Sequence, residues 1–221
     1  MTPIETRQLA EQVYELLLQE ILHGTLRPGE RILDQELAAE LGISRTPVKD
    51  AINRLSMEGL LEIHPRRGTF VIEPDRDSFN ELMDVRLMME LYAITQLPCK
   101  ASARAIEEME RAIRAIDDMI AADSFRNIPA YMALDGDFHR ALIAGVGNGR
   151  LSHLYRSIAI HNQIGRIKYP HDSFLEAQEE HRLILDAYTR CARDDLTELL
   201  TRHVEQARKQ VLGLIDDDLD E

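Results

Sequence analysis

The chain has 221 residues, of which 44% are hydrophobic, so wholesale disorder is excluded. No apolar run approaches the ~20 residues of a membrane helix, and the segment from Met1 to Glu11 lacks the pattern of a secretory signal. The two cysteines, Cys99 and Cys191, form no disulfide framework. These features predict a cytoplasmic protein that has no membrane partner.

The net charge of −13 is unevenly distributed along the chain. The segment between Leu41 and Phe70 carries five basic and three acidic side chains, whereas the remainder is strongly acidic. Phosphate groups respond to charges within a Debye length of roughly 8–10 Å. A local basic segment can therefore bind nucleic acid, while the acidic remainder disfavours non-specific binding elsewhere.

The first 74 residues are predicted to form three helices and a β-hairpin. Apolar residues at helical spacing predict helices over about 6–22, 34–41 and 44–58, and Pro47 suits the first turn of the third. Short apolar stretches at 60–63 and 69–72, joined by a Pro-Arg-Arg-Gly turn, indicate the hairpin. A short helix, a glycine-containing turn and a second helix are typical of a helix-turn-helix. Residues 1–74 are therefore interpreted as a winged helix-turn-helix domain.

The third helix would place its N-terminal residues in the major groove of DNA. Arg45 can donate two hydrogen bonds to a guanine edge, and short hydroxyl side chains suit phosphate oxygens. The candidate DNA-binding residues are Ser44, Arg45, Thr46 and Lys49, with Arg66, Arg67 and Gly68 at the hairpin tip. The alternative is a protein-interaction module in which Arg45 is a solvated surface charge.

From residue 78 onward the sequence shows only helical periodicity. Breaks divide it into about six helices near 78–97, 100–121, 127–144, 149–167, 174–191 and 195–213. Short loops between them predict an antiparallel bundle over residues 78–214, and the acidic tail from Asp216 to Glu221 is expected to fray. The fold class is therefore mainly α.

Four residues of this half are candidate metal ligands. Asp135 and His139 stand four apart on one helix, and His181 and His203 lie on later helices among apolar residues. An inward imidazole is costly unless it is hydrogen-bonded or ligated. One carboxylate and three imidazoles suit zinc first, with nickel, manganese or iron(II) as alternatives. They could also be hydrogen-bonded core residues, bind a ligand without metal, or hold a catalytic ion.

The motifs Leu37-Ala-Ala-Glu-Leu41-Gly42-Ile-Ser44-Arg45-Thr46-Pro47 and Pro65-Arg66-Arg67-Gly68-Thr69-Phe70 resemble those of the GntR family of bacterial regulators. The resemblance covers about residues 8–73. It implies that Ser44, Arg45, Thr46, Lys49 and the wing contact operator DNA. Lys49-Asp50 departs from the usual Arg-Glu, so phosphate contact is expected for Lys49 in place of base reading.

The second half is similar to the FadR-type C-terminal (FCD) domain over about residues 78–210. The similarity rests on Val85-Arg86-Leu-Met-Met-Glu90, Asp135-Gly-Asp-Phe-His139, Glu180-His181-Arg-Leu-Ile and His203. In metal-binding members an Asp and a His four apart join two later histidines, which implies the same metal site here. The family binds small organic acids beside the metal. Arg86 could receive the acid's carboxylate, although an ordinary ion pair with Glu90 is the interpretation we favour.

These inferences combine into a DNA-binding transcription regulator, a homodimer bound to double-stranded operator DNA. A small organic acid bound near the metal would control operator affinity, and repression is the expectation because most relatives are repressors. A metal-free acid or acyl sensor of the same family, or a helical metalloenzyme, is the alternative. No general base is evident near the candidate ligands, so a role as an enzyme is not expected.

Overall fold

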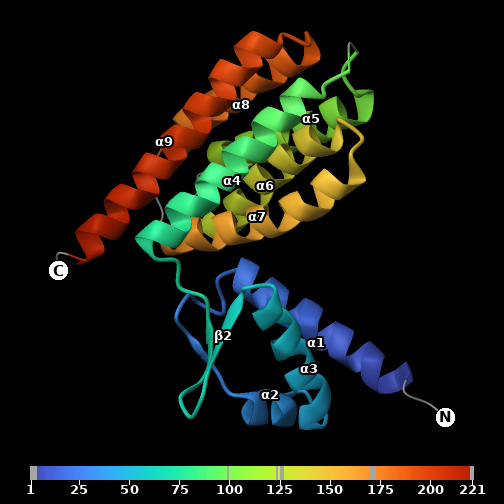
Figure 1. Ribbon diagram of the computed structural model, residues 1–221, viewed down its shortest axis with the longest axis vertical. Coiled ribbons are helices and arrows are strands. Elements are labelled where there is room, and N and C mark those ends of the chain that lie inside the picture. Colours follow the sequence, from blue (N-terminus) through green and yellow to red (C-terminus); the bar gives the residue numbers. More distant parts are fainter. Residues whose placement is uncertain (1–3, 99, 123, 125–126, 170–172, 220–221) are drawn as a thin grey trace. The chain divides into compact units, whose positions relative to one another are not determined.

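The computed structural model describes residues 4–98, 100–122, 124, 127–169 and 173–219, and Cys99 lies outside these ranges. The chain divides into two compact units, Met1–Pro74 and Asp75–Glu221. Figure 1 shows the strands in the first unit, whereas the second is built from helices. Of the helices in the described ranges, none is long and apolar enough to cross a membrane.

The first unit has the helix and hairpin order that the sequence predicts. It contains α1 (Ile4–Leu22), β1 (Arg31–Ile32), α2 (Asp34–Glu40), α3 (Arg45–Met57), β2 (Leu61–His64) and β3 (Gly68–Val71). Val13 and Leu17 of α1 and Val48 of α3 are buried in its core, where the two helices pack together. The sheet has the order β1-β3-β2 and is antiparallel throughout. This arrangement is a winged helix-turn-helix.

The strand β1 was not predicted because two residues are too few to show an alternating pattern. Arg31 and Ile32 pair with Phe70 and Thr69 of β3, which makes the wing a three-stranded sheet. At the tip of the wing, Gly68 has a φ of +119°, and a Cβ there would lie 2.7 Å from Nε of Arg31. Glycine at this position therefore leaves room for the Arg31 side chain.

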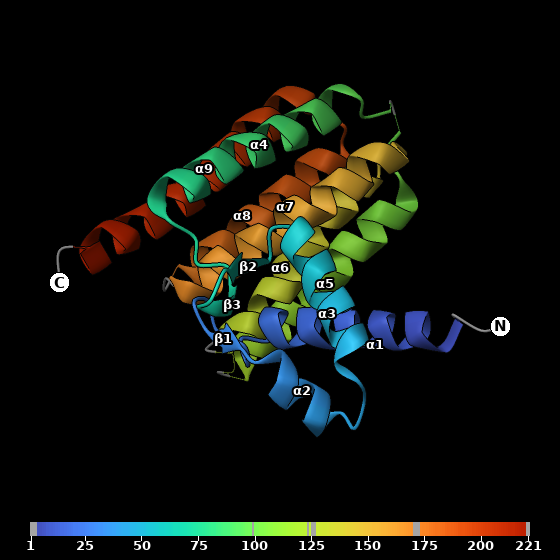
Figure 2. The same ribbon diagram turned by 60° about the horizontal axis from the view of Figure 1, so that its bottom comes forward.

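The second unit contains six helices among the residues described. They are α4 (Arg76–Thr95), α5 (Ala103–Ala121), α6 (Ile128–Ala144), α7 (Gly149–Lys168), α8 (Phe174–Thr189) and α9 (Arg193–Leu219). They follow one another round the bundle in the order α4, α7, α6, α5, α8 and α9, and α9 packs again on α4. Figure 2 shows this contact of α4 with α9. Side chains from all six helices can therefore reach the interior.

Several helix ends of the second unit differ from the expectation, among them the start of α5, which lies at Ala103 and not near 100. The helix α4 begins at Arg76 because the carboxylate of Asp75 accepts hydrogen bonds from the backbone N–H groups of Asp77 and Ser78. The helix α9 continues to Leu219, so the expected fraying of the acidic tail is wrong for its described part. Ile215 is buried there, and Asp216 forms a 2.7 Å ion pair with Arg76, which ties the last turns to α4.

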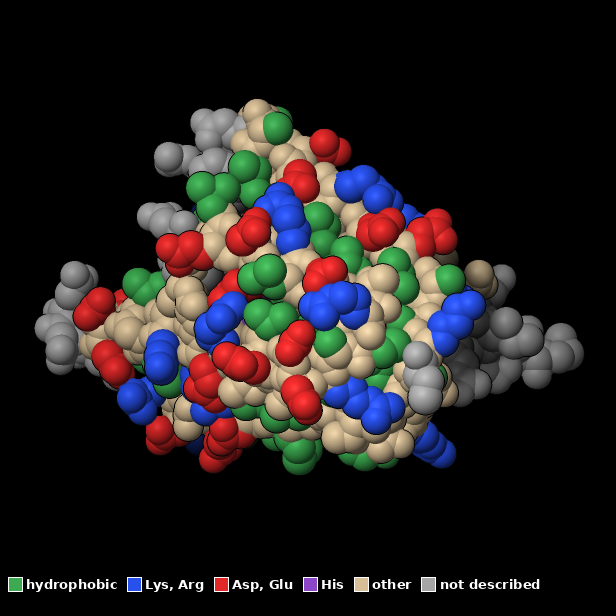
Figure 3. Space-filling model, turned by 90° about the horizontal axis from the view of Figure 1, so that it is seen from above, with side chains coloured by type: hydrophobic (Ala, Val, Ile, Leu, Met, Phe, Trp, Pro, Cys, Tyr) green, Lys and Arg blue, Asp and Glu red, His purple; other side chains and the backbone are tan. Residues whose placement is uncertain are grey.

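The outer surface of the bundle is rich in charged pairs. On α5, Arg104 pairs with Glu108 and Arg114 with Glu110, each four residues apart. On the face drawn in Figure 3, acidic and basic side chains are likewise interspersed among apolar ones. Such exposed pairs contribute little to stability, roughly 0–1 kcal/mol each.

The interior is unusual in its polar content. Apolar side chains such as Met109, Phe138 and Tyr188 fill much of it. The buried polar residues of this unit are Arg86, Glu90, Asp135, His139, Asn162, Gln163, Arg166, Gln178, His181 and His203. Buried charges are costly unless they are paired or bind a ligand, so these residues mark the candidate site.

Candidate metal centre

Asp135, His139, His181 and His203 come together inside the bundle. Asp135 and His139 lie one turn apart on α6, His181 lies on α8, and His203 lies on α9. Each is at most 2% exposed, and one ligand atom from each lies within 4.8 Å of the others. Nε2 of His139 is 3.2 Å from Nε2 of His203, and Nε2 of His181 is 3.5 Å from Oδ1 of Asp135. The four side chains therefore face a common point.

The Nδ1 atoms of the imidazoles face a second group of polar side chains. His203 Nδ1 is 2.8 Å from Oε2 of Glu180, and His139 Nδ1 is 3.4 Å from Oε1 of Glu90. A carboxylate can only accept, so Nδ1 of His203 carries the proton in that hydrogen bond. Its Nε2 is then left with a free lone pair, as a metal ligand requires.

Gln178 orients the third imidazole. Its amide NH₂ donates to the carbonyl of Ile113 at 2.9 Å and to Asp117 Oδ1 at 2.7 Å, both on α5. The amide oxygen must then face His181, whose Nδ1 lies 3.4 Å away. This arrangement favours a proton on Nδ1 of His181 as well. Nε2 of His181 is then unprotonated, and its lone pair faces the point that the four side chains share.

Electrostatics favour the ligand form of these groups. Burial lowers the pKa of His181 well below its ordinary value and also lowers that of His139, so both imidazoles are neutral at pH 7. Burial alone would raise the pKa of Asp135, but the neighbouring side chains, Arg166 foremost, together outweigh burial, lower the pKa and hold the carboxyl group ionised. Neutral imidazoles and an ionised carboxylate are the protonation states that metal binding needs.

The residues fit a divalent cation. Two ligand atoms on opposite sides of an ion with bonds of about 2.0–2.2 Å lie roughly 4.4 Å apart, close to the spread found here. Oδ1 of Asp135 and Nε2 of His181 are buried and have no hydrogen-bond partner. The two Nε2 lone pairs of His139 and His203 would repel at 3.2 Å unless a cation or proton lay between them. The donor set suits zinc and neighbouring divalent metals.

Arg86 lies beside this centre on α4. Its Nε donates to Oε1 of Glu90 at 2.8 Å, so the ion pair that the sequence suggests is present, and both side chains are buried. Burial acts to lower the pKa of Arg86, but Glu90, with smaller contributions from Tyr155 and Asp135, outweighs burial and raises it. Nη1 and Nη2 of Arg86 are nevertheless buried without a partner. Such donors are costly to leave unpaired, so they mark a place for an anion.

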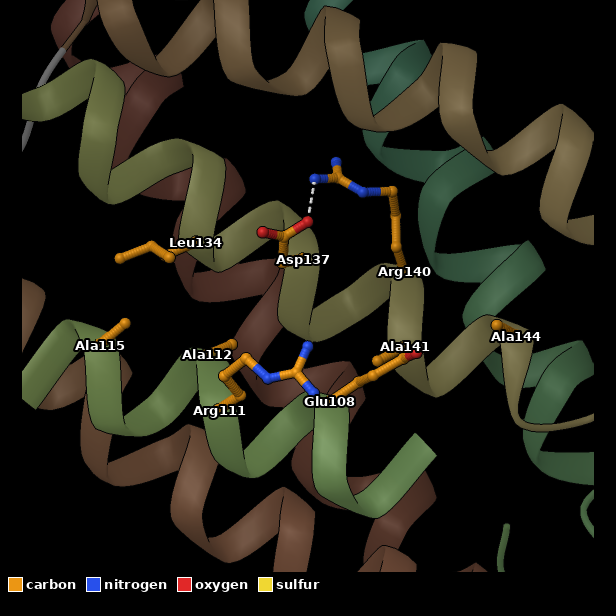
Figure 4. A pocket seen from close by; sticks show the side chains of 9 residues that line it. All are labelled: Glu108, Arg111, Ala112, Ala115, Leu134, Asp137, Arg140, Ala141 and Ala144. Atoms are coloured by element: carbon orange, nitrogen blue, oxygen red, sulfur yellow. Dashed lines mark hydrogen bonds and ion pairs between the residues drawn. The ribbon is translucent and has the colours of Figure 1, made fainter. Parts of the chain in front are cut away.

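A surface groove between α5 and α6 also carries two arginines. It encloses about 380 Å³, and Figure 4 shows its floor of small side chains, including Ala112 and Ala141, with Arg111 and Arg140 at the rim. Arg140 forms a 2.6 Å ion pair with Asp137, and Arg111 lies 3.6 Å from Glu107. These arginines are already paired, so the interior beside Arg86 is the better site for an anionic ligand.

The candidate DNA-binding residues are exposed in the first unit. Ser44 is the N-cap of α3, and Arg45, Thr46 and Lys49 follow it on the surface. The Arg45 side chain is 51% exposed and forms a 2.8 Å ion pair with Asp34 of α2. Arg66 and Arg67 are exposed at the hairpin turn, and Gly68 beside them is half-buried. Arg45 is thus the first residue of α3, with its side chain on the surface.

The residues around the four candidate ligands were largely missed in the sequence. Arg166, which lies 3.3 Å from Asp135 Oδ2, stands on α7 in a polar run that resembles a solvated face. Glu180 and Gln178 offered a weak signal, because each is close to His181 in the sequence. Gln178 stands three residues before His181, one helical turn away, and its amide is the group that orients that histidine.

The comparisons with known proteins agree with this architecture. Residues 9–71 match the model of the bacterial regulatory proteins of the gntR family, and residues 81–206 match the FCD domain. The chain is 30% identical over 192 residues to the Nta operon transcriptional regulator of Aminobacter aminovorans, covering 86% of this chain and 88% of the relative. It is 28% identical to a protein of Paenarthrobacter nicotinovorans described as a probable D-xylose utilization operon repressor, covering 89% and 85%.

Solved structures show the same fold. A transcriptional regulator from Rhodococcus sp. RHA1 superposes with a TM-score of 0.83 at 24% identity, covering 92% of this chain and 97% of that one. A second structure, described as a metal-free FCD domain of a transcriptional regulator, has a TM-score of 0.52 at 17% identity, covering 66% and 99%.

Proposed function

Since this chain belongs to the GntR family of bacterial regulatory proteins and carries an FCD domain, we propose that a metal-dependent acid sensor in its bundle controls operator binding by its winged helix. The chain is a transcription regulator, as its family is. The observation that carries the proposal is the convergence of four buried metal-ligand atoms beside a buried arginine with two unpartnered nitrogens.

The metal would be held by Asp135, His139, His181 and His203. When bound, a divalent ion supplies a fixed positive charge and open coordination positions for an anionic ligand. Zinc is the ion we expect first, with nickel, manganese and iron(II) as alternatives for the same donor set. Glu90, Gln178 and Glu180 would hold the imidazoles in the ligating orientation.

The effector would be a small organic acid. Nη1 and Nη2 of Arg86 form the planar fork that binds a carboxylate through two parallel hydrogen bonds. Buried Tyr131 and Asn162 each have a polar atom without a hydrogen-bond partner and could bind further groups of the acid. The ion pair uses only Nε of Arg86, so effector binding and the ion pair are compatible.

A homodimer would provide the two DNA-binding heads, and we place its interface on α4 and α7. Val85, Met88 and Tyr92 form an exposed apolar stripe on α4, and Leu154 is 60% exposed on the neighbouring helix α7. Acidic Glu81 lies one turn before the stripe on α4, and basic Arg150 lies one turn before Leu154 on α7. Packing a second copy on this face would bring Glu81 of one chain near Arg150 of the other. A monomeric mass in sedimentation equilibrium would exclude this arrangement.

In the cell, this protein would act in the cytoplasm as a repressor. The helix α3 would enter the major groove, Arg45 would read a guanine, and Ser44, Thr46, Lys49, Arg66, Arg67 and Gly68 would contact the backbone or minor groove. A relative is named as a probable operon repressor, which supports repression here.

The DNA-binding mode is tested by Arg45→Ala. On a duplex selected by the wild-type protein from a random pool, we expect affinity to fall about 5- to 150-fold and preference at one base pair to relax, as for loss of a bidentate guanine contact of about 1–3 kcal/mol. Fluorescence anisotropy at several salt concentrations measures both effects. Arg111→Ala on α5 removes an equal charge from the other unit and should leave operator affinity unchanged. Equal affinities of the Arg45 variant and the wild type would refute the docking mode.

A further inference from the structure

The carboxylate of Glu90 joins the candidate acid site to the candidate metal centre. Its Oε1 accepts a hydrogen bond from Nε of Arg86 at 2.8 Å and another from the hydroxyl of Tyr155. The same oxygen lies 3.4 Å from Nδ1 of His139, which is buried and has no hydrogen-bond partner. Glu90 is fully buried, and its other oxygen has no partner. One carboxylate oxygen therefore contacts both the arginine and a metal-ligating histidine.

Glu180 provides an internal comparison. Its Oε2 contacts Nδ1 of His203 at 2.8 Å, so it faces a metal-ligating imidazole as Glu90 does. Its other oxygen lies 3.4 Å from the exposed Arg202, on the outer side of the bundle. In the described part of the chain, Glu180 forms no hydrogen bond or ion pair with Arg86. The two glutamates therefore share the imidazole contact and differ in the link to the acid site.

We propose that Glu90 is the positioning residue that couples acid binding to metal binding, an inference that rests on the proposed function. A carboxylate bound at Nη1 and Nη2 neutralises the positive charge of Arg86, which otherwise offsets the charge of Glu90. The Glu90 carboxylate then attracts the Nδ1 proton of His139 more strongly. A hydrogen bond formed there, in place of the present 3.4 Å approach, makes Nε2 a better metal ligand. Acid and metal thereby increase each other's affinity by the same factor.

The experiment measures zinc affinity of the full-length protein with and without acetate. Acetate is a minimal carboxylate that chelates zinc weakly, and chloride replaces it at constant ionic strength in the reference. Competition with a fluorescent zinc indicator gives the dissociation constant for the wild type and for Glu90→Gln and Glu180→Gln. Glutamine keeps the shape and the acceptor oxygen but removes the charge. Circular dichroism and the metal-free melting temperature verify that each variant folds.

We expect saturating acetate to raise wild-type zinc affinity about 5- to 150-fold, the usual range of coupling between sites. Glu180→Gln should weaken zinc binding about 10- to 100-fold, as loss of a carboxylate that orients a ligating imidazole does, while keeping the acetate effect. Glu90→Gln should weaken zinc binding and reduce the acetate effect to less than threefold. Glu90→Asp, which keeps the charge, should restore part of it.

Three results would overturn the inference: no acetate effect in the wild type, a full effect in Glu90→Gln, or equal loss in both glutamine variants. They are distinguishable from failure of the proposed function, in which the wild type would bind no zinc at all or acetate would not raise its melting temperature. If Glu90→Gln does not fold, Tyr155→Phe provides the second test. Loss of the tyrosine hydroxyl removes a hydrogen bond that stabilises the negative charge of Glu90. The carboxylate should then attract the His139 proton more strongly and raise zinc affinity in the absence of acetate. An unchanged zinc affinity would count against the coupling role.

Discussion

Replacing His203 with alanine should weaken zinc binding by more than about 100-fold. Loss of a direct ligand costs more than the 10- to 100-fold lost when a side chain that hydrogen-bonds to a ligand is removed. The wild-type protein, at a free zinc concentration 100 times its dissociation constant, should gain about 2.7 kcal/mol of stability. For a chain of this size that gain corresponds to roughly 5–10 °C in melting temperature. Calorimetry with and without zinc measures the increment, which should vanish in the variant.

The matched control is His153→Ala, which removes an exposed histidine of α7 that lies outside the cluster. It should keep the wild-type zinc increment. Because the increment is compared within each protein, any loss of stability of the metal-free variant does not affect the result. An undiminished zinc increment in His203→Ala would show that the metal binds elsewhere or that a different ligand set holds it.

Arg86→Lys should reduce the affinity for a small carboxylic acid such as lactate by about 10-fold or more. Lysine keeps the positive charge beside Glu90 but loses the two Nη donors, and a hydrogen bond to a charged group contributes about 1.5–3 kcal/mol. Isothermal titration of the zinc-loaded protein measures the effect. Deleting the charge altogether, as in Arg86→Met, should cost about 3–5 kcal/mol of stability in urea unfolding, because Glu90 would be left as an unpaired buried charge.

Arg111→Lys is the control for the acid site, since Arg111 lies at the rim of the surface groove between α5 and α6. It should leave acid affinity unchanged. If instead Arg111→Lys weakened acid binding while Arg86→Lys did not, the effector would bind in the groove, and the assignment of the interior site would be wrong.

In the proposed mechanism, the helix α4 would connect acid and metal binding to the DNA-binding half. It begins at Arg76, five residues after β3 ends at Val71, so it follows the wing directly in the chain. Its buried side carries Arg86 and Glu90, and its outer side carries the apolar stripe proposed as the dimer interface. In the proposed mechanism, a change at the acid site would therefore act on the helix that follows the winged domain in the chain. Regulation of this kind needs about 1–3 kcal/mol of differential stability between two states.

The convergence of the four candidate ligands could be predicted because histidines replace apolar residues in regular helical stripes. His181 precedes Ile184 and Tyr188 on the inward face of α8, and His203 lies between Leu200 and Val204 on α9. In a bundle, inward stripes of different helices must meet. Local periodicity was therefore sufficient to bring the imidazoles together without knowledge of the packing angles.

The groups that orient the ligands could not be predicted in the same way. Arg166 reaches Asp135 from α7 and Gln178 reaches α5, so both depend on which helices are neighbours in the ring. Sequence spacing records contacts within a helix but not those between helices. For the same reason the ion pair of Arg86 with Glu90 could be predicted from their spacing of four residues in the sequence. The approach of Glu90 to His139 of α6 could not, because it joins two helices.

The most direct test of the metal centre is anomalous X-ray scattering from crystals of the purified full-length protein, recorded at the zinc, nickel, iron and manganese edges. The account predicts one strong peak per chain, about 2.0–2.2 Å from Oδ1 of Asp135 and from Nε2 of the three histidines. Metal-loaded crystals without a peak at that point, or with peaks only at surface residues, would contradict it.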